Sequence, residues 1–262
     1  MALPPDALRQ FLKCVSVYSC LNIDDASEEP GLYAWYGILA AGPKDWALQL
    51  NGGEDEGEAA SRTLLQKHCS RFDSPPLQLK ARGTFSSRWR GDLRDISSQH
   101  ISSVLNGSAE DEDEDELQWG REDGKKEEAR GEILAGILRS ESDRRLLLDT
   151  LTFATPILSA PLYIGVATRL RQRLRQHVDS LIKYSEAINR NPSLKEKLLQ
   201  HKRTNFASRA VGMGFSPDML SVWTLPLAQI SKGEHPEDKL RDIAEVVEWF
   251  LNRWNRPLLG KR

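Results

Sequence analysis

The sequence predicts an α+β fold, with a small sheet flanked by helices and a long α+β insertion between two of its strands. Three short stretches are rich in aromatic and branched residues, which is typical of strands: 31–38, 162–167 and 220–228. Longer stretches around them carry apolar residues at helical spacing. Between 106 and 131 the chain is highly charged and contains four glycines, which indicates a solvated loop inside the insertion.

Four further elements are expected before that loop. Residues 5–20 are spaced like a short amphipathic helix, with Asp6 as its N-cap. Residues 45–50 are a candidate second strand. Residues 59–72 have a helical period, and 77–85 alternate like another strand.

Helices dominate the predicted elements after the loop. Residues 132–153 are helical in period. Thr168 is placed to cap a helix over 169–184, and another basic helix follows to about residue 201. A short helix ended by glycine is expected within 205–215. The last helix is expected from Pro236 to about residue 254.

Charge is distributed very unevenly along the chain. The formal net charge is −2, but 110–116 is an unbroken run of seven acids. Residues 161–210 hold eleven Lys or Arg and three Asp or Glu, a net charge of +8. A local positive field of this size favours phosphate-rich partners. The acidic run is read as solvated, and its functional alternative is a mimic of nucleic acid that competes for the basic surface.

Cysteine content and hydropathy bear on the cellular location of the protein. Cys14, Cys20 and Cys69 suggest neither a disulfide framework nor a paired metal motif. The N-terminal residues lack the basic start and apolar core of a signal peptide. No apolar run approaches the ~20 residues that a membrane-spanning helix needs. We therefore expect a cytoplasmic protein with no membrane partner.

Two tripeptides carry a family resemblance. Gly31-Leu32-Tyr33 resembles the first signature of the GIY-YIG nuclease superfamily, with leucine in place of isoleucine. Tyr163-Ile164-Gly165 matches the second signature.

Spaced positions extend the resemblance along the chain. The family places leucine, arginine, leucine and histidine at set offsets after the second tripeptide, and here these are Leu170, Arg173, Leu174 and His177. A glutamate nine residues ahead of a proline follows, as at Glu248 and Pro257. The resemblance covers roughly 31–41 and 161–260.

The resemblance implies a largely antiparallel sheet and a metal-dependent DNA endonuclease. Mg²⁺ or Mn²⁺ would take Glu248 as its one protein ligand, since Mg²⁺ keeps several waters. Arg173 would grip the scissile phosphate through its planar guanidinium. A tyrosine would activate the attacking water together with the metal. Tyr33 is assigned this role and Tyr163 the positioning of water or phosphate, although the two are interchangeable. His177 would hydrogen-bond a tyrosine or a phosphate oxygen.

Tyrosine needs help to act as a base. A phenol has a pKa of about 10 and accepts a proton poorly unless nearby positive charge lowers that value. Arg173, His177 and the metal are expected to supply the charge.

Strand geometry supports the tyrosine pair independently. Alternate side chains of a strand share a face, so Leu162 and Ile164 would point to the core and leave Tyr163 on the other face. If 31–38 pairs antiparallel with 161–166, Tyr33 lies beside Tyr163.

Helical spacing supports the other candidates. Arg173 and His177 are four residues apart and share one edge of a buried stripe, which consists of Leu170, Leu174, Val178 and Leu181. In the last helix, the expected apolar face consists of Leu240, Ile243, Val247, Phe250, Leu251 and Trp254. Glu248 falls at the margin of that face, whereas Glu245 points well away from it.

Several basic residues are expected to contact the DNA backbone without reading its sequence. They are Arg169, Arg171, Arg175 and Lys183 in the basic helix. In the insertion, Arg88 and Arg90 flank Trp89, and such a mixture of arginine and aromatic residues can grip a groove and stack on bases. Each also has an ordinary reading as a surface charge. The candidates of the site have ordinary readings too: the tyrosines as strand aromatics, the histidine as a helix cap, and Arg173 and Glu248 as exposed charges. Their ordered spacing favours the functional reading.

The sequence departs from the family at the late proline. Many members have asparagine three residues after it, where this chain has Gly260, and Asn255 is a possible substitute. This departure keeps open a catalytically impaired nucleic-acid-binding module. A third alternative is an interaction subunit of a larger defence complex that docks through its acidic loop.

The expected organisation has three parts. Residues 1–30 form a helical extension, 31–41 and 161–262 form the nuclease core, and 42–160 form the insertion, whose flexible acidic loop spans about 106–131. Long insertions between the tripeptides favour a bacterial restriction or phage-defence enzyme by analogy. Its partners would be DNA, a second copy in a homodimer, and a defence-system protein.

Overall fold

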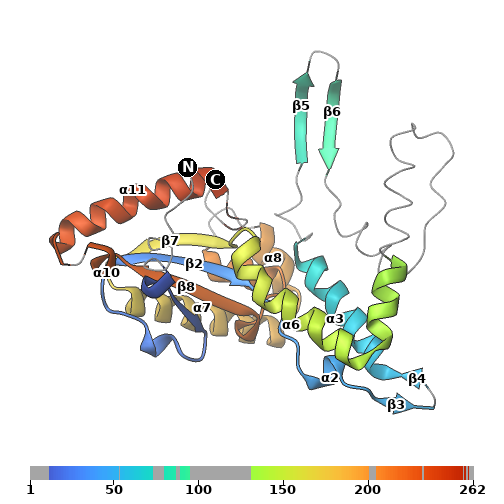
Figure 1. The fold of residues 1–262 in the computed structure, drawn as a ribbon. Helices are drawn as coiled ribbons and strands as arrows, with labels where there is room; N and C mark the ends of the chain where they lie inside the picture. Colours follow the sequence, from blue (N-terminus) through green and yellow to red (C-terminus); the bar gives the residue numbers. More distant parts are fainter. Residues whose placement is uncertain are drawn as a thin grey trace. The chain divides into compact units, whose positions relative to one another are not determined.

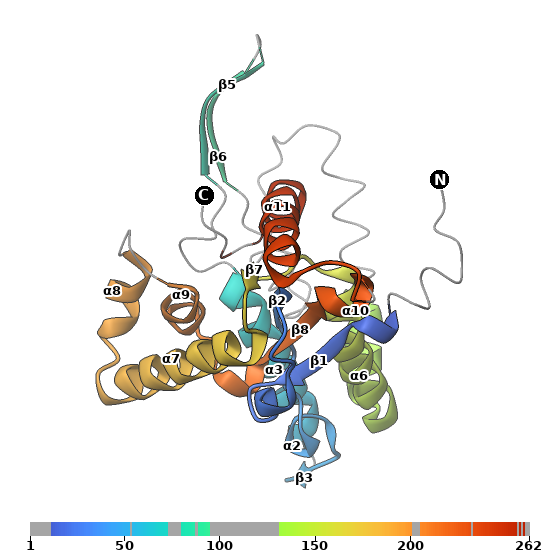
Figure 2. The same cartoon turned by 90° about the vertical axis from the view of Figure 1, so that its left-hand side faces the viewer.

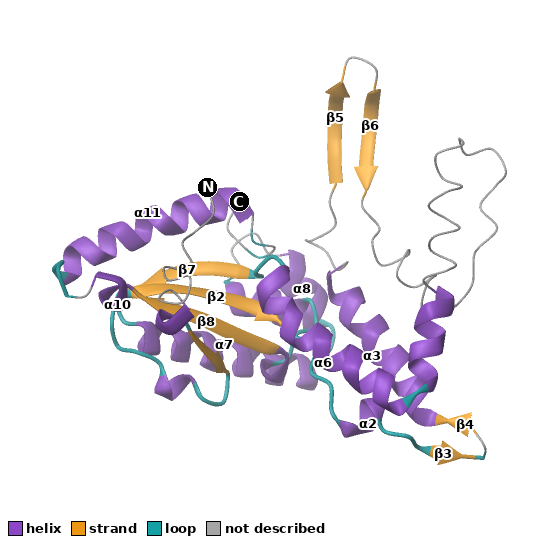
Figure 3. Cartoon of the chain, viewed as in Figure 1, coloured by secondary structure: helices purple, strands orange, loops and turns teal. Residues whose placement is uncertain are grey.

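The computed structural model describes residues 12–52, 54–72, 80–86, 89–94, 131–200, 205–231, 233–255, 257 and 259. The chain divides into two compact units, one formed by residues 1–38 and 154–262 and the other by residues 39–153. Helices and a small antiparallel sheet make up the first unit, so the predicted α+β class is confirmed (Figures 1 and 3). In the part of the chain described here, no helix combines the length and apolar character needed to cross a membrane.

The sheet of the first unit has four strands in the order β1-β8-β2-β7. The strands are β1 (Ser16–Ser19), β2 (Gly31–Gly37), β7 (Tyr163–Ala167) and β8 (Leu220–Pro226). All three pairings are antiparallel, and Tyr33 of β2 stands opposite Gly165 of β7. Trp35 stands opposite Tyr163. β7 is therefore an edge strand, and the two tyrosines come from neighbouring strands.

Helices cover both faces of this sheet, and Figures 1 and 2 show α7 and α11 on opposite sides of it. The helices are α7 (Leu170–Arg190), α8 (Leu194–Gln200), α9 (Phe206–Gly212), α10 (Leu227–Ser231) and α11 (Glu237–Asn255). The ring of Trp35 stacks on Phe206 of α9, with the centroids 5.5 Å apart. Leu32, one residue away from Tyr33, packs with Leu240 and Ala244 of α11. Strand alternation thus sends odd positions of β2 toward α7 and α9, and even positions toward α11.

The buried stripe of α7 explains its helical form. Leu170, Leu174, His177 and Leu181 are buried at spacings of four, three and four residues, which is the period of one helical face. This confirms Leu170, Leu174 and Leu181 of the predicted stripe, but the fourth buried position is His177, and Val178 is only partly buried.

Two segments differ from the elements that the sequence predicts. Residues 16–19 form strand β1 instead of continuing a helix, because Val17 and Tyr18 alternate in burial and pair with β8. A favourable edge of the sheet here overrides a weak helical pattern. Residues 43–46 form the short helix α2 (Pro43–Trp46), whose Asp45 carboxylate accepts a hydrogen bond from the Gly42 N–H at 2.8 Å. Only Leu50 and Asn51 of the predicted 45–50 strand form β3, with its two-residue partner β4 (Glu54–Asp55).

The predicted apolar face of α11 is partly wrong. Leu240, Ala244 and Val247 make the contacts to the sheet. Phe250 is 39% exposed and Trp254 is 71% exposed. Their spacing placed these aromatic residues on the predicted face, but the sheet packs against the narrower stripe of Leu240, Ala244 and Val247.

The second unit has its own small core. Leu39, Leu65, Leu138 and Leu148 pack together. They come from the segment after β2, from α3 (Glu56–Phe72), from a helical stretch at 131–139, and from α6 (Glu141–Leu158). The unit also contains an antiparallel hairpin of β5 (Lys80–Ser86) and β6 (Trp89–Arg94). The predicted helix at 59–72 and the strand at 77–85 are thus largely confirmed.

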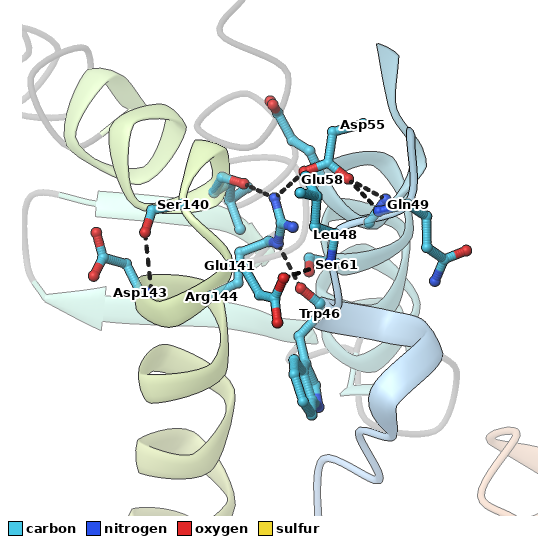
Figure 4. A network of polar contacts seen from close by, with 12 residues as sticks. Trp46, Leu48, Gln49, Asp55, Glu58, Ser61, Ser140, Glu141, Asp143 and Arg144 are labelled. Atoms are coloured by element: carbon cyan, nitrogen blue, oxygen red, sulfur yellow. Dashed lines mark hydrogen bonds and ion pairs between the residues drawn. The ribbon is translucent and has the colours of Figure 1, made fainter. Parts of the chain in front are cut away.

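A buried arginine joins the elements of the second unit (Figure 4). The side chain of Arg144 is fully buried, and its Nη1 donates to Asp55 Oδ2 and to the Leu138 carbonyl at 2.6 Å each. Its Nε donates to the Trp46 carbonyl at 2.9 Å. We call these four residues the Arg144 cluster. Desolvation opposes ionisation of Asp55, but hydrogen bonds from Gln49, Arg144 and Gly57 outweigh it and hold its pKa below the usual value.

Candidate active site

A glycine opens the space in which the first tyrosine lies. Tyr33 reaches from β2 across Gly165 of the neighbouring strand. A Cβ atom added at Gly165 would stand 2.5 Å from the Tyr33 hydroxyl oxygen and 2.6 Å from Cζ. A side chain at this position would therefore displace the phenol. Gly165, the last residue of the Tyr-Ile-Gly tripeptide, thus leaves the space that the Tyr33 side chain occupies.

The Tyr33 hydroxyl is the centre of a buried polar chain. It lies 2.9 Å from His177 Nε2, and Arg173 Nε donates to it at 3.4 Å. Burial, and secondly the positive charge of Arg173, lower the pKa of His177 to about 3, so the imidazole is neutral at pH 7. Arg173 keeps its charge, because the oxygens of Tyr33 and Tyr163 raise its pKa in spite of desolvation.

The protonation state of Tyr33 differs from the expectation. Burial raises the pKa of Tyr33 well above the usual value, the nearby Tyr163 adds to this, and the Arg173 hydrogen bond offsets it only in part. His177 supplies no positive charge because it is neutral. The phenol therefore keeps its proton at neutral pH in the free protein.

Tyr163 completes the cluster at the sheet edge. Its ring centroid lies 6.0 Å from those of Tyr33 and His177 and 5.2 Å from that of Phe206. Trp35 and Phe206 form an apolar wall beside the imidazole, with centroids 6.2 and 5.4 Å from it. Trp35 was identifiable from the sequence, because it lies two residues after Tyr33 on the same strand face. Phe206 had no such signal.

The structure thus brings four predicted residues together: Tyr33, Tyr163, Arg173 and His177. We call them the tyrosine cluster. They come from β2, β7 and α7, and the pairing of β2 with β7 and the packing of α7 fix their positions.

A pocket of about 350 Å³ adjoins the tyrosine cluster at Arg173. It is lined from the end of β7 and the first turns of α7 and α11, among others by Thr168, Arg169, Gln172, Arg173, Arg241 and Glu245. We call it the arginine pocket. The sequence does not single out Arg241 or Gln172, because neither belongs to a motif with a recognisable spacing.

Glu245 lines the arginine pocket, which its predicted direction on the helix did not suggest. It points away from the apolar face, as predicted, but this direction makes it a wall of the arginine pocket beside Arg173. Its carboxylate accepts a hydrogen bond from Arg241 Nε at 3.2 Å. The cleft lies next to the helix and not beneath it, so a residue far from the apolar face reaches it.

Glu248 lies one helical turn beyond Ala244, at the edge of the stripe of α11 that packs on the sheet. It is half-buried. α11 runs antiparallel to β7. Its first turns share a pocket with Val166 and Ala167, and beyond its end the Leu259 N–H donates to the Leu162 carbonyl at 2.6 Å. Glu248 therefore lies on the α11 side of the sheet, whereas Tyr33 and Tyr163 lie on the side of α7 and α9, so it is not a member of the tyrosine cluster.

The predicted DNA-contacting arginines of α7 divide into two groups. Arg171 donates Nε to the Ala26 carbonyl at 2.7 Å and pairs with Glu28 at 3.1 Å. Arg175 pairs with Asp24 at 2.5 Å. These two arginines therefore hold the segment before β2, which the sequence did not predict. Arg169 and Lys183 are exposed.

Other candidates are placed only in part. Arg90 lies in β6 and Asn255 is the last residue of α11. Arg88, Gly260 and the acidic run 110–116 lie outside the described residues.

The described residues fit only a sparsely ligated cation. Among them, no group of three or more His, Cys, Asp or Glu side chains gathers to hold a metal ion. A single carboxylate suits Mg²⁺ or Mn²⁺ when a phosphate and waters complete the shell, and does not suit a tightly held zinc ion.

Comparisons of the chain with protein-family models, with curated proteins and with solved structures give no match.

Proposed function

We propose that this protein is a metal-dependent DNA endonuclease of the GIY-YIG type, acting in the bacterial cytoplasm in restriction or phage defence. The observation that carries the proposal is the chain from Arg173 Nε to the Tyr33 hydroxyl to His177 Nε2. A charged guanidinium, a phenol and a neutral imidazole lie in series, with a second phenol beside them. This is a set of groups for phosphodiester hydrolysis.

The neutral imidazole gives the Tyr33 proton a destination. Arg173 donates to the phenol oxygen, and Nε2 of a neutral His177 can accept the phenol's proton. A water that attacks phosphorus would pass its proton to Tyr33 as Tyr33 passes its own to His177. The pKa of His177 is too low for this in the free protein, partly because of Arg173. A bound phosphate beside Arg173 would offset that repulsion and raise the pKa of His177.

Arg173 also has the geometry to hold the phosphate. Its Nε is directed at Tyr33 and its Nη1 at Gln176 Oε1, at 3.2 Å. Both partners are neutral, so the positive charge remains available to the substrate. Tyr163, half-buried at the edge strand, is positioned to orient the phosphate or the water.

Glu248 is the residue that would hold the cation. When bound, Mg²⁺ or Mn²⁺ supplies charge stabilisation for the leaving oxygen. Glu248 is half-buried, and one carboxylate would suffice as the protein ligand because such a cation keeps several waters.

Nicking of supercoiled plasmid with Mg²⁺, Mn²⁺ or EDTA tests the function. Tyr33→Phe should lower the nicking rate by ~10²-fold or more, as expected for loss of a proton-transfer group. Glu248→Gln should abolish the metal-dependent activity. The matched control is Tyr36→Phe, since Tyr36 lies on the same strand and packs edge-on against Trp223. Equal rates for the two phenylalanine variants, or no nicking by the wild type with either metal, would reject the proposal.

A non-cleaving nucleic-acid-binding module is the second candidate. The protonated state of Tyr33 in the free protein favours it, and so does the glycine at 260. It predicts a shifted plasmid band without nicked product under all metal conditions. The same gel therefore separates the two functions.

A further inference from the structure

The residues that line the arginine pocket carry more positive than negative charge. It receives Arg169 and Arg173 from α7 and Arg241 from α11. Of its lining residues only Glu245 is acidic, and this carboxylate is bonded to Arg241 at 3.2 Å. Two of the three guanidinium charges therefore remain without a compensating acid among the lining residues. Gln172 and Thr168 add neutral groups that hydrogen-bond an oxyanion.

We propose that the arginine pocket binds the DNA backbone phosphate next to the scissile one, with Arg241 as its anchor. The inference rests on the proposed function and extends it, since it names a second contact of the same strand. Its volume of about 350 Å³ accommodates a phosphodiester group with part of its sugar.

Arg173 connects the pocket to the tyrosine cluster. One residue lines the pocket and also donates to the Tyr33 hydroxyl. A strand whose scissile phosphate is held by the exposed side of Arg173 would therefore bring its neighbouring phosphate into the pocket that Arg173 also lines. Binding there would fix the register of the strand at the reacting atoms.

Glu245 competes with the phosphate for Arg241. The Arg241–Glu245 pair joins exposed side chains on one helix, each 55% accessible, so little free energy holds it together. An arriving phosphate accepts the Arg241 donors and leaves the carboxylate to solvent. The two members of the pair should thus have opposite effects on DNA binding.

Fluorescence anisotropy with a 20-base-pair duplex that carries fluorescein and no terminal phosphate tests this inference. The measurement is made in EDTA over a series of salt concentrations, so no cleavage is required. Arg241→Gln should weaken binding several-fold and reduce the slope of log K against log salt by about 1, as for loss of one phosphate contact. Glu245→Gln should tighten binding.

The control is Arg190→Gln. Arg190 is an exposed arginine of α7 that pairs with Glu186 at 3.1 Å, four residues earlier, as Arg241 pairs with Glu245. It should bind DNA like the wild type. A structural role for the Arg241–Glu245 pair would make Arg241→Gln and Glu245→Gln change binding in the same direction, which would overturn the inference.

The outcomes separate this inference from the proposed function. If Arg241→Gln binds and nicks like Arg190→Gln while Tyr33→Phe is inactive, the pocket assignment is wrong and the nuclease remains. If binding depends on Arg241 as predicted and no variant nicks plasmid, the pocket assignment holds and the nuclease fails. A wild type that does not bind the duplex overturns both.

Discussion

Two arginines, one in each unit, have opposite surroundings. Arg144 in the second unit is fully buried and donates to a carboxylate and two backbone carbonyls. Arg173 in the first unit is exposed and donates to a phenol and an amide. Within the described residues, no carboxylate pairs with Arg173. An arginine neutralised by its neighbours stabilises a fold, whereas one with neutral neighbours keeps its charge for an incoming anion.

The largest expected effect is on stability, and it tests the role of the buried Arg144. Arg144→Met should lower the free energy of unfolding by ~2–4 kcal/mol, because the Trp46 and Leu138 carbonyls both lose their donor. Urea denaturation followed by circular dichroism measures it. Arg145→Met is the control, since Arg145 is 62% exposed, pairs with Asp149 and lies over the Trp46 ring, 5.1 Å from its centroid. Arg173→Met should also stay close to wild type in stability. Equal losses for the Arg144 and Arg173 variants would refute the distinction.

Gly165→Ala should have the next largest effect and acts on the tyrosine cluster. The added methyl would stand 2.5 Å from the Tyr33 hydroxyl oxygen, so the phenol must move away from His177. Overpacking of this kind costs ~1–3 kcal/mol, measurable by thermal denaturation. Gly136→Ala is the control, because nothing lies within 4 Å of a Cβ there. If both variants match the wild type, the close approach of Tyr33 to Gly165 is wrong.

Acid should destabilise the first unit through His177. The unfolded chain protonates this histidine near its ordinary pKa of 6.5, whereas the folded protein does so only near 3. The unfolded state therefore binds more protons between these values, and stability falls as the pH is lowered through this window. From pH 6 to pH 5 the loss is ~1 kcal/mol from this group. His177→Asn should flatten the measured pH dependence of stability by that amount.

His68 sharpens the comparison between the units. Burial, with Arg71 as the second cause, lowers its pKa to about 4 in α3 of the second unit. His68→Asn should flatten the pH dependence over a narrower window, since stability is lost only down to about 4. A wild type with no change in stability between pH 6 and pH 4 would contradict burial of both neutral histidines.

The smallest effect is expected at Arg175. This arginine pairs with Asp24 across exposed surface, 55% and 71% accessible. Arg175→Gln should change the free energy of unfolding by less than ~1 kcal/mol. In the anisotropy assay it tests the predicted DNA contact. A reduced salt slope would support that contact, and an unchanged slope would limit Arg175 to its structural pair.

Local spacing predicted much of the site. Tyr163, Arg173 and His177 lie in one strand and the helix after it, so periods of two and of 3.6 residues fixed their directions. The same rule placed Tyr33 beside Tyr163 once antiparallel pairing was assumed. Each of these positions depends on spacing within one element or on the pairing of two strands, and both can be inferred from the sequence pattern.

What the sequence could not predict depends on tertiary packing. Strand β1 forms because it pairs with β8 at the edge of the sheet, and no feature of residues 16–19 indicates this pairing. Glu245 became a pocket wall because the pocket lies beside α11, which no wheel of a single helix shows. Arg144 gave no signal at all, since its partner Asp55 lies 89 residues away in the chain. The partners of Arg144 come from α2, β4 and the helical stretch at 131–139, so its burial depends on how these elements pack together.

The strands that carry the two tyrosines form a hairpin whose connection contains the whole second unit, because β2 pairs with β7 and residues 39–153 lie between them. A folded connection holds its ends within a limited distance, whereas an unfolded one closes at an entropic cost of ~0.6 kcal/mol for each doubling of its effective length. A tenfold increase amounts to about 2 kcal/mol. Mutations that melt the second unit would thus loosen the pairing of Tyr33 with Tyr163 without touching either residue.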